Sequence, residues 1–228
     1  MEKTSTFKRL RDALQQGIYG VINPFVRLLI KMGVTPNIVT TIGLIGNAAA
    51  AGIFAWAALT ATPGDLRYDL VTLAGAVIIL FSLFDMLDGQ VARLGGMVSR
   101  FGALYDSVLD RYCEMLTLGG IAYYMFAIGR PITALITFLA MVGSVMVSYV
   151  RARAEGLDIE CKVGFMQRPE RVVVTSVGAL AAGICGLCDC PFDALIILTV
   201  AMAVIAIFAN ITAFARIAHC RRALTANK

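Results

Sequence analysis

The sequence predicts an all-α, polytopic membrane protein with six transmembrane helices preceded by an N-terminal interfacial amphipathic helix. Of the 228 residues, 59% are hydrophobic and only 15% are charged, and the mean hydropathy is +0.79. A composition this apolar is typical of a chain whose main solvent is lipid. Its long apolar segments lack the alternation of transmembrane β-strands. Because backbone groups in hydrocarbon must pair within their own segment, these segments are expected to be helices.

Each of the six segments can cross a bilayer, since a helical span needs about 20 mostly apolar residues. The expected spans are Asn37 to Leu59, Leu70 to Gly89, Gly102 to Ile128, Pro131 to Val150, Val172 to Leu187 and Ala194 to Ala218. The fifth span is the shortest, and it could start earlier. Thr35 and Pro36 predict the start of the first span, as N-cap and first helical residue. The pair Gly95-Gly96 predicts a tight antiparallel hairpin between the second and third spans.

Two parts of the chain are expected, an interfacial segment over residues 1–35 and a membrane domain over residues 36–228 that ends in a short tail. Four apolar side chains recur at helical spacing among basic residues in the first part: Phe7, Leu10, Leu14 and Ile18. This pattern is typical of a helix lying on a membrane surface. A solvated helix packed on the membrane domain has the same pattern.

Lysine and arginine are distributed unevenly between the loops. With the termini and the second and fourth loops on one side, all 20 of them except Arg67 and Arg130 lie on that side. The positive-inside rule therefore predicts cytoplasmic termini in a multi-pass protein of the cell membrane. The net charge of +5 fits anionic lipid headgroups better than nucleic acid. Near the fifth loop, the spacing of Cys185, Cys188 and Cys190 permits a metal-binding site (a metal knot) or a disulfide. We favour the interpretation that they are incidental thiols without a specific role.

Four aspartates enter two successive membrane helices within 26 residues: Asp85, Asp88, Asp106 and Asp110. A carboxylate at the bilayer centre costs about 2.5 to 3.5 kcal/mol on insertion scales, so the cluster requires a cationic partner. By helical spacing, the first two share one face of the second span and the last two share one face of the third. At a rise of about 1.5 Å per residue from the glycine turn, the depths of the two pairs match. We therefore expect all four carboxylates to converge on one point.

Carboxylate oxygens suit Mg²⁺, Mn²⁺ or Ca²⁺, and the absence of His and Cys among them argues against zinc. Four carboxylates are a natural site for two divalent ions, which can bridge a diphosphate. Gly89, Ala92 and Gly102 leave room for a bulky polar ligand, and Arg93 can hold phosphate oxygens. Three alternatives are a proton or cation path of a transporter, pairing of the aspartates with nearby arginines, and a structural metal site.

This segment resembles the signature of the CDP-alcohol phosphotransferases, D-x2-D-G-x2-A-R-x8-G-x3-D-x3-D. Every specified position matches: Asp85, Asp88, Gly89, Ala92, Arg93, Gly102, Asp106 and Asp110. Eight such matches arise by chance at on the order of 10⁻¹⁰ per starting position. The resemblance implies transfer of the substituted phosphate of a CDP-diacylglycerol-type lipid to an alcohol, with CMP leaving and two Mg²⁺ or Mn²⁺ ions bound.

The resemblance also implies roles for individual residues. Asp85, Asp88 and Asp106 would hold the ions, and Asp110 would both bind them and take the proton from the attacking hydroxyl. Gly89 would admit the cytosine, with Ala92 and Gly102 beside it, and Arg93 would steady the diphosphate. The resemblance implies, less strongly, that Asn37 lies near the nucleotide. A role at the start of a helix explains an asparagine at this position equally well. Homodimers are usual in such families.

The fourth loop resembles that of the inositol-phosphate-accepting branch of the family. Arg151 and Arg153 close one helix and Arg171 opens the next, so the three can converge on the phosphate of the acceptor. Ordinary positive-inside charge is the alternative. We interpret Arg168 as part of the ordinary positive charge of this loop, without a role in the site. Gln167 occupies a position where related chains often carry Glu. The expected acceptor is inositol phosphate, with glycerol 3-phosphate as the alternative; a cation- or proton-coupled transporter is a more distant one.

Overall fold

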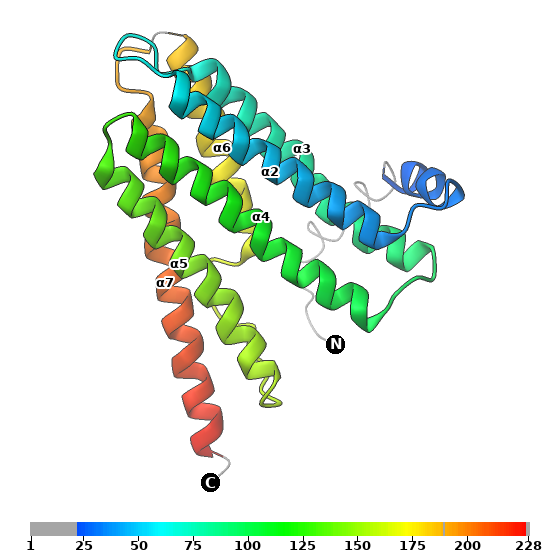
Figure 1. Ribbon diagram of the computed structural model, residues 1–228. Helices are drawn as coiled ribbons and strands as arrows, with labels where there is room; N and C mark the ends of the chain where they lie inside the picture. Colours follow the sequence, from blue (N-terminus) through cyan, green and yellow to red (C-terminus); the bar gives the residue numbers. More distant parts are fainter. Residues whose placement is uncertain (1–21, 189, 227–228) are drawn as a thin grey trace, which may run out of the picture.

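The structure is a computed structural model that describes residues 22–188 and 190–226 (Figure 1). A helix over residues 22–31 comes first. Six long helices follow: α2 (Pro36–Thr60), α3 (Tyr68–Leu94), α4 (Arg100–Ala127), α5 (Pro131–Glu155), α6 (Arg168–Leu187) and α7 (Leu195–Ala226). The described residues contain no strand, only one isolated bridge between Thr62 and Asp65. The all-α prediction is therefore confirmed, while the predicted amphipathic residues Phe7 to Ile18 lie outside the described part.

Five of these helices are long and apolar enough to cross a membrane: α2, α3, α5, α6 and α7. The chain is thus a multi-pass membrane protein. Helix α4 is equally long, with 28 residues, but it carries Asp106, Asp110, Arg111 and Glu114 before and near its middle. These charges lower its hydropathy, and its crossing as a sixth span stays a prediction.

The helix starts follow the local signals in the chain. Thr35 is the N-cap of α2 and Pro36 opens the helix, as predicted, although the Thr35 side chain makes no capping hydrogen bond. Helix α6 begins at Arg168, four residues before the predicted Val172. Pro169 in the first turn explains the earlier start, because proline is favoured there and has no N–H that needs a partner.

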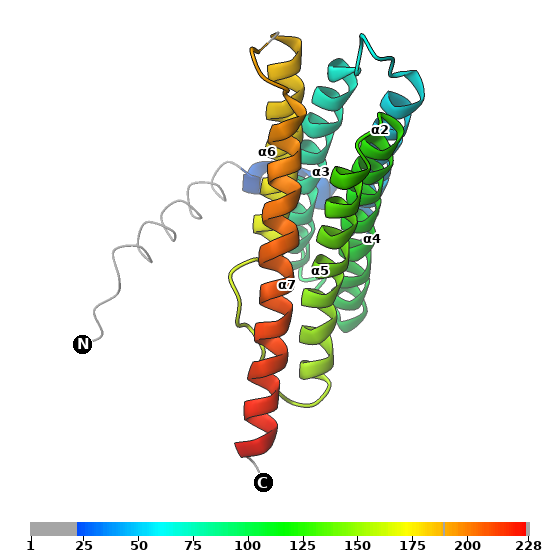
Figure 2. The same cartoon turned by 90° about the vertical axis from the view of Figure 1, so that its left-hand side faces the viewer.

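The helices pack so that α2 lies between α3 and α4 (Figure 1). Helix α6 packs on α3 and α7, and α5 packs on α4 and α7, as the turned view also shows (Figure 2). The prediction of a tight α3–α4 hairpin is therefore wrong. Gly96 does make the turn with a left-handed φ of 64°, but the two helices diverge from it and barely touch. Cavities lie beside their aspartate-bearing faces instead.

Small residues set the close helix contacts of the bundle. A β carbon at Gly75 would lie 2.6 Å from the backbone nitrogen of Leu180, and one at Gly183 would lie 2.5 Å from that of Thr72. Glycine therefore permits α3 and α6 to approach backbone to backbone, as small residues commonly do between membrane helices. This contact lies in the half of α3 away from the aspartates, and it aligns α6 along α3 so that the start of α6 lies beside Asp85.

The end of the bundle opposite the aspartates carries little free charge. Arg67 pairs with Asp69 at 2.8 Å and Arg130 pairs with Asp193 at 2.5 Å. These are the two arginines that the charge bias places opposite the others. Nearby, Cys185 and Cys188 are free thiols. Within the described residues, no cysteine-containing group is arranged to bind a metal, so the metal-knot alternative has no support.

Candidate active site

The four aspartates lie in one neighbourhood, two on α3 and two on α4. Asp88 is buried and accepts a hydrogen bond of 2.7 Å from the Thr40 hydroxyl of α2. Asp106 lies close enough to Asp85, Asp88 and Asp110 to repel each of them. The predicted grouping of Asp85 and Asp88 with Asp106 and Asp110 is therefore present, although the helices that carry the two pairs are not packed together.

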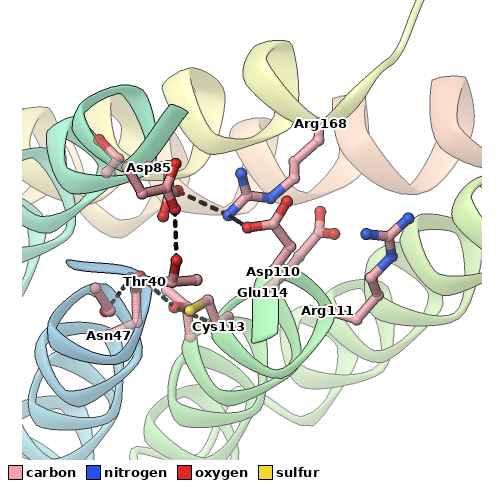
Figure 3. A network of polar contacts seen from close by, with 12 residues as sticks. Thr40, Asn47, Asp85, Asp110, Arg111, Cys113, Glu114 and Arg168 are labelled. Carbon is pink, nitrogen blue, oxygen red and sulfur yellow. Dashed lines mark hydrogen bonds and ion pairs between the residues drawn. The ribbon is translucent and has the colours of Figure 1, made fainter. Parts of the chain in front are cut away.

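Arg168 reaches from α6 into this group (Figure 3). Its Nη2 atom lies 2.7 Å from Asp85 Oδ2 and 2.8 Å from Asp110 Oδ1. The assignment of Arg168 to loop charge is therefore wrong. Because α6 starts at this residue, its side chain leaves the first helical turn toward α3 and α4.

The carboxylates do not meet at a single point in this structure. Among the described residues, no group of three His, Cys, Asp or Glu side chains is arranged to hold a metal ion. The Arg168 guanidinium stands between Asp85 and Asp110, which explains the difference from the expected convergence. The donor set still fits a hard divalent ion, because it consists of carboxylate oxygens. In addition, Asp110 Oδ1 is buried without a hydrogen-bond partner.

A first cavity, the glycine-lined cavity, opens between α2 and the ends of α3 and α4 and has a volume of about 230 Å³. Its lining includes every predicted nucleotide-side residue and two of the aspartates: Asn37, Asp88, Gly89, Ala92, Arg93, Gly102 and Asp106. A β carbon at Gly89 would lie 3.5 Å from Arg93 Nη2, and one at Gly102 would lie 3.5 Å from Asn37 Oδ1. Larger residues at these positions would therefore take space from the cavity.

A second cavity, the arginine-lined cavity, lies on the other side of the carboxylates and has a volume of about 180 Å³. Five arginines and one aspartate supply its charged lining: Asp110, Arg111, Arg151, Arg168, Arg171 and Arg216. Arg151 and Arg171 are there as predicted. Arg153 is exposed and does not line it, because residues two positions apart on a helix face different sides.

Arg171 is held more tightly than the sequence indicates. Its side chain is 1% exposed and donates hydrogen bonds of 2.5 and 2.9 Å to the two carboxylate oxygens of Glu114. A third bond of 3.1 Å reaches the Met166 carbonyl. Glu114 is absent from the predicted site, although it extends the stripe of Asp106 and Asp110 by one more helical turn.

Arg216 and Thr40 are two further residues absent from the predicted site. Arg216 of α7 is buried and donates to the carbonyls of Val163 and Val147 at 2.9 and 2.7 Å. It thereby fixes the loop before α6 to α5. Neither residue belongs to a recognisable pattern, and only the packing of α2 and α7 brings them to the site.

The model of the CDP-alcohol phosphatidyltransferase family matches residues 33–220. This chain belongs to that family. The resemblance based on the aspartate signature is thus confirmed, and the chain is a phosphotransferase enzyme of phospholipid biosynthesis. Its match runs from before α2 into α7, so it includes both cavities as well as the signature.

Curated relatives of this family member are phosphatidylinositol phosphate synthases. The one from Mycolicibacterium smegmatis is 36% identical over 197 residues, which cover 85% of this chain and 81% of the relative. The one from Cutibacterium acnes is 32% identical over 205 residues, which cover 89% of this chain and 93% of the relative.

Solved structures agree with these sequence relationships. The crystal structure of Mycobacterium tuberculosis phosphatidylinositol phosphate synthase (PgsA1) with CDP-DAG bound superposes with a TM-score of 0.73 at 30% identity, covering 86% of this chain and 92% of that chain. The same enzyme in complex with manganese and citrate gives the same TM-score and identity. Use of a divalent metal therefore occurs in this family.

Proposed function

We propose that this enzyme transfers the phosphatidyl group of CDP-diacylglycerol, or of an ether-lipid equivalent, to inositol phosphate, giving phosphatidylinositol phosphate and CMP. One observation carries the proposal: the carboxylates lie between two cavities of different chemistry. Asp88 and Asp106 line the glycine-lined cavity, and Asp110 lines the arginine-lined cavity. A transferase needs this arrangement, because donor and acceptor must reach the reacting phosphorus from different sides.

The glycine-lined cavity fits the donor. The small residues Gly89, Ala92 and Gly102 leave space for a cytosine and its diphosphate, and Arg93 offers charged donors to phosphate oxygens. Asn37 lies at the same wall and can bind the nucleotide. The apolar chains of a lipid donor can remain in the bilayer, since both α3 and its neighbour α2 have the length and composition of membrane spans.

The arginine-lined cavity fits a phosphorylated acceptor. Arg151 and Arg171 line it together with three further arginines, and such a site favours a phosphate dianion over an uncharged alcohol. Asp110 lines the same cavity, so an acceptor phosphate held by these arginines places the acceptor hydroxyl near its carboxylate.

In the proposed reaction, Asp110 takes the proton of the acceptor hydroxyl as the hydroxyl oxygen attacks the phosphorus that carries diacylglycerol. The bond from that phosphorus to the bridging oxygen of the diphosphate breaks, and CMP leaves with the bonding electron pair. Asp85, Asp88, Asp106 and Asp110 would hold two Mg²⁺ or Mn²⁺ ions. When bound, such ions stabilise the negative charge that develops on the leaving phosphate.

Release of CMP from CDP-diacylglycerol by the purified protein in detergent, with Mn²⁺ or Mg²⁺, tests the proposal. We expect release with inositol phosphate and much less with glycerol 3-phosphate or free inositol. Faster release with glycerol 3-phosphate would replace the proposed acceptor and identify a phosphatidylglycerophosphate synthase. No release with any of these acceptors would contradict the proposed reaction.

We further infer that the enzyme acts as a homodimer in the cell membrane with its termini and both cavities toward the cytoplasm. The charge bias between the loops supports this orientation. Labelling of Cys220 by an impermeant maleimide, in a variant whose other five cysteines are replaced by serine, tests it: labelling only after the cells are opened would agree, and labelling of intact cells would contradict it. The mass of the detergent-solubilised protein tests the dimer.

A further inference from the structure

The contacts of Arg168 differ in quality from those of its neighbour Arg171. Arg171 donates two bonds to one carboxylate and a third to a carbonyl. Arg168 makes one hydrogen bond, from Nη2 to Asp85, and its contact with Asp110 is an ion pair without hydrogen-bond geometry. Its Nε is buried with no hydrogen-bond partner. Arg171 is thus fixed by its contacts, whereas Arg168 is held mainly by charge.

The place that Arg168 occupies is also one that divalent ions need. Its guanidinium lies within 2.8 Å of one oxygen each of Asp85 and Asp110, two of the four proposed metal ligands. A guanidinium and a metal ion at these two carboxylates compete for the same oxygens, and their like charges repel each other in a partly buried site. Metal loading therefore has to move the Arg168 side chain.

The direction of that movement follows from the surroundings. Arg168 already lines the arginine-lined cavity together with Asp110, and its side chain is 23% exposed. Away from the carboxylates, this cavity of about 180 Å³ offers the side chain room to turn. Four other arginines line it, so a fifth free guanidinium is costly there unless an anion is present.

We propose that Arg168 is a displaceable counterion: it neutralises Asp85 and Asp110 before metal loading, and when the ions bind it turns into the arginine-lined cavity and binds the anion there. Metal and acceptor phosphate then bind cooperatively, because each stabilises the displaced position of Arg168. By thermodynamic linkage the two ligands raise each other's affinity by the same factor. This inference rests on the proposed function for the location of the metal and the acceptor.

Calorimetric titration of the purified full-length protein in detergent, without CDP-lipid, tests this coupling with Mn²⁺ and sulfate as probes. In the wild type, we expect saturating Mn²⁺ to tighten sulfate binding by about tenfold, within the range usual for coupled sites. In Arg168→Gln, Mn²⁺ alone should bind more tightly than in the wild type, because no guanidinium has to be displaced. The same variant should lose most of the coupling between Mn²⁺ and sulfate.

Arg151→Gln is the matched control, since Arg151 lines the same cavity but pairs with Glu155 and not with an aspartate of the cluster. It should weaken sulfate binding and keep the coupling factor. Arg168→Lys retains the charge and should show intermediate coupling between Mn²⁺ and sulfate. This variant tests the proposal if Arg168→Gln folds poorly. Full coupling in a folded Arg168→Gln protein, or equally full coupling in Arg168→Lys when only that variant folds, would overturn the proposal.

The CMP-release assay separates this inference from the proposed function. Suppose that the wild-type protein turns over inositol phosphate but binds sulfate with the same affinity with and without Mn²⁺. This result would contradict the counterion role and leave the proposed function intact. Coupling between Mn²⁺ and sulfate, with no CMP released from CDP-diacylglycerol when inositol phosphate is the acceptor, would contradict the proposed function and leave the counterion role intact.

Discussion

The Arg171 guanidinium and the Glu114 carboxylate form a forked ion pair between α6 and α4, with N–O distances of 2.5 and 2.9 Å. The two side chains are only 1% and 8% exposed. Because α4 and α6 make little other contact, this pair is a principal tie between them. It therefore holds one wall of the arginine-lined cavity, and its removal should affect both stability and the acceptor site.

Glu114→Gln should lower the free energy of unfolding by about 3 kcal/mol, because it leaves the Arg171 charge buried without a partner. Denaturant unfolding in detergent measures the change. Glu155→Gln is the control, since Glu155 pairs with Arg151 at the surface, and it should cost less than about 1 kcal/mol. Equal effects of the two variants would show that the buried pair does not tie the helices.

Asp110→Asn should reduce turnover by about 10²- to 10⁴-fold, the range lost when a general base is removed. The amide has nearly the same shape, so binding of CDP-diacylglycerol should change little. Steady-state release of CMP and equilibrium binding of the lipid measure the two effects. Asp158→Asn, at an exposed loop position with a left-handed φ of 57° that asparagine tolerates, should behave as the wild type. Retained activity in Asp110→Asn would remove its role as the base.

Gly89→Ala should raise the KM for CDP-diacylglycerol by about tenfold, equivalent to about 1.4 kcal/mol. The added methyl group would lie 3.5 Å from Arg93, so the protein should fold normally while the glycine-lined cavity loses space. Gly52→Ala is the control, because its β carbon would meet nothing within 4 Å. A KM that is unchanged in Gly89→Ala would place the nucleotide elsewhere.

Thr40→Val should raise the Mn²⁺ concentration required for half-maximal activity by about 10- to 100-fold, the usual effect of removing a partner that orients a metal ligand. The reason is the loss of the 2.7 Å hydrogen bond to Asp88. Activity measured across a Mn²⁺ titration gives the value. Thr40→Ser keeps the hydroxyl and should stay near the wild type. If both variants require the same Mn²⁺ concentration as the wild type, Thr40 does not orient Asp88.

Local patterns in the sequence were sufficient for much of the site. Helical periodicity placed Asp85 with Asp88 and Asp106 with Asp110, and similar distances from the Gly95-Gly96 turn predicted that their depths match. Of these residues, the structure brings Asp88 and Asp106 together with Gly89 and Gly102 around one cavity. Such inferences succeed because spacing along a single helix, or across one short turn, is set by backbone geometry alone.

The sequence by itself determined the all-α membrane architecture, the family signature and the two helix faces that carry the carboxylates. Only the tertiary structure decided that α2 separates α3 from α4, that Arg168 lies between Asp85 and Asp110, and that Arg171 is fixed to Glu114. The physical reason is distance along the chain: Arg168 and Asp85 are 83 residues apart, and Arg171 and Glu114 are 57 apart. No local periodicity encodes such contacts, because they depend on how the surfaces of separate helices fit together.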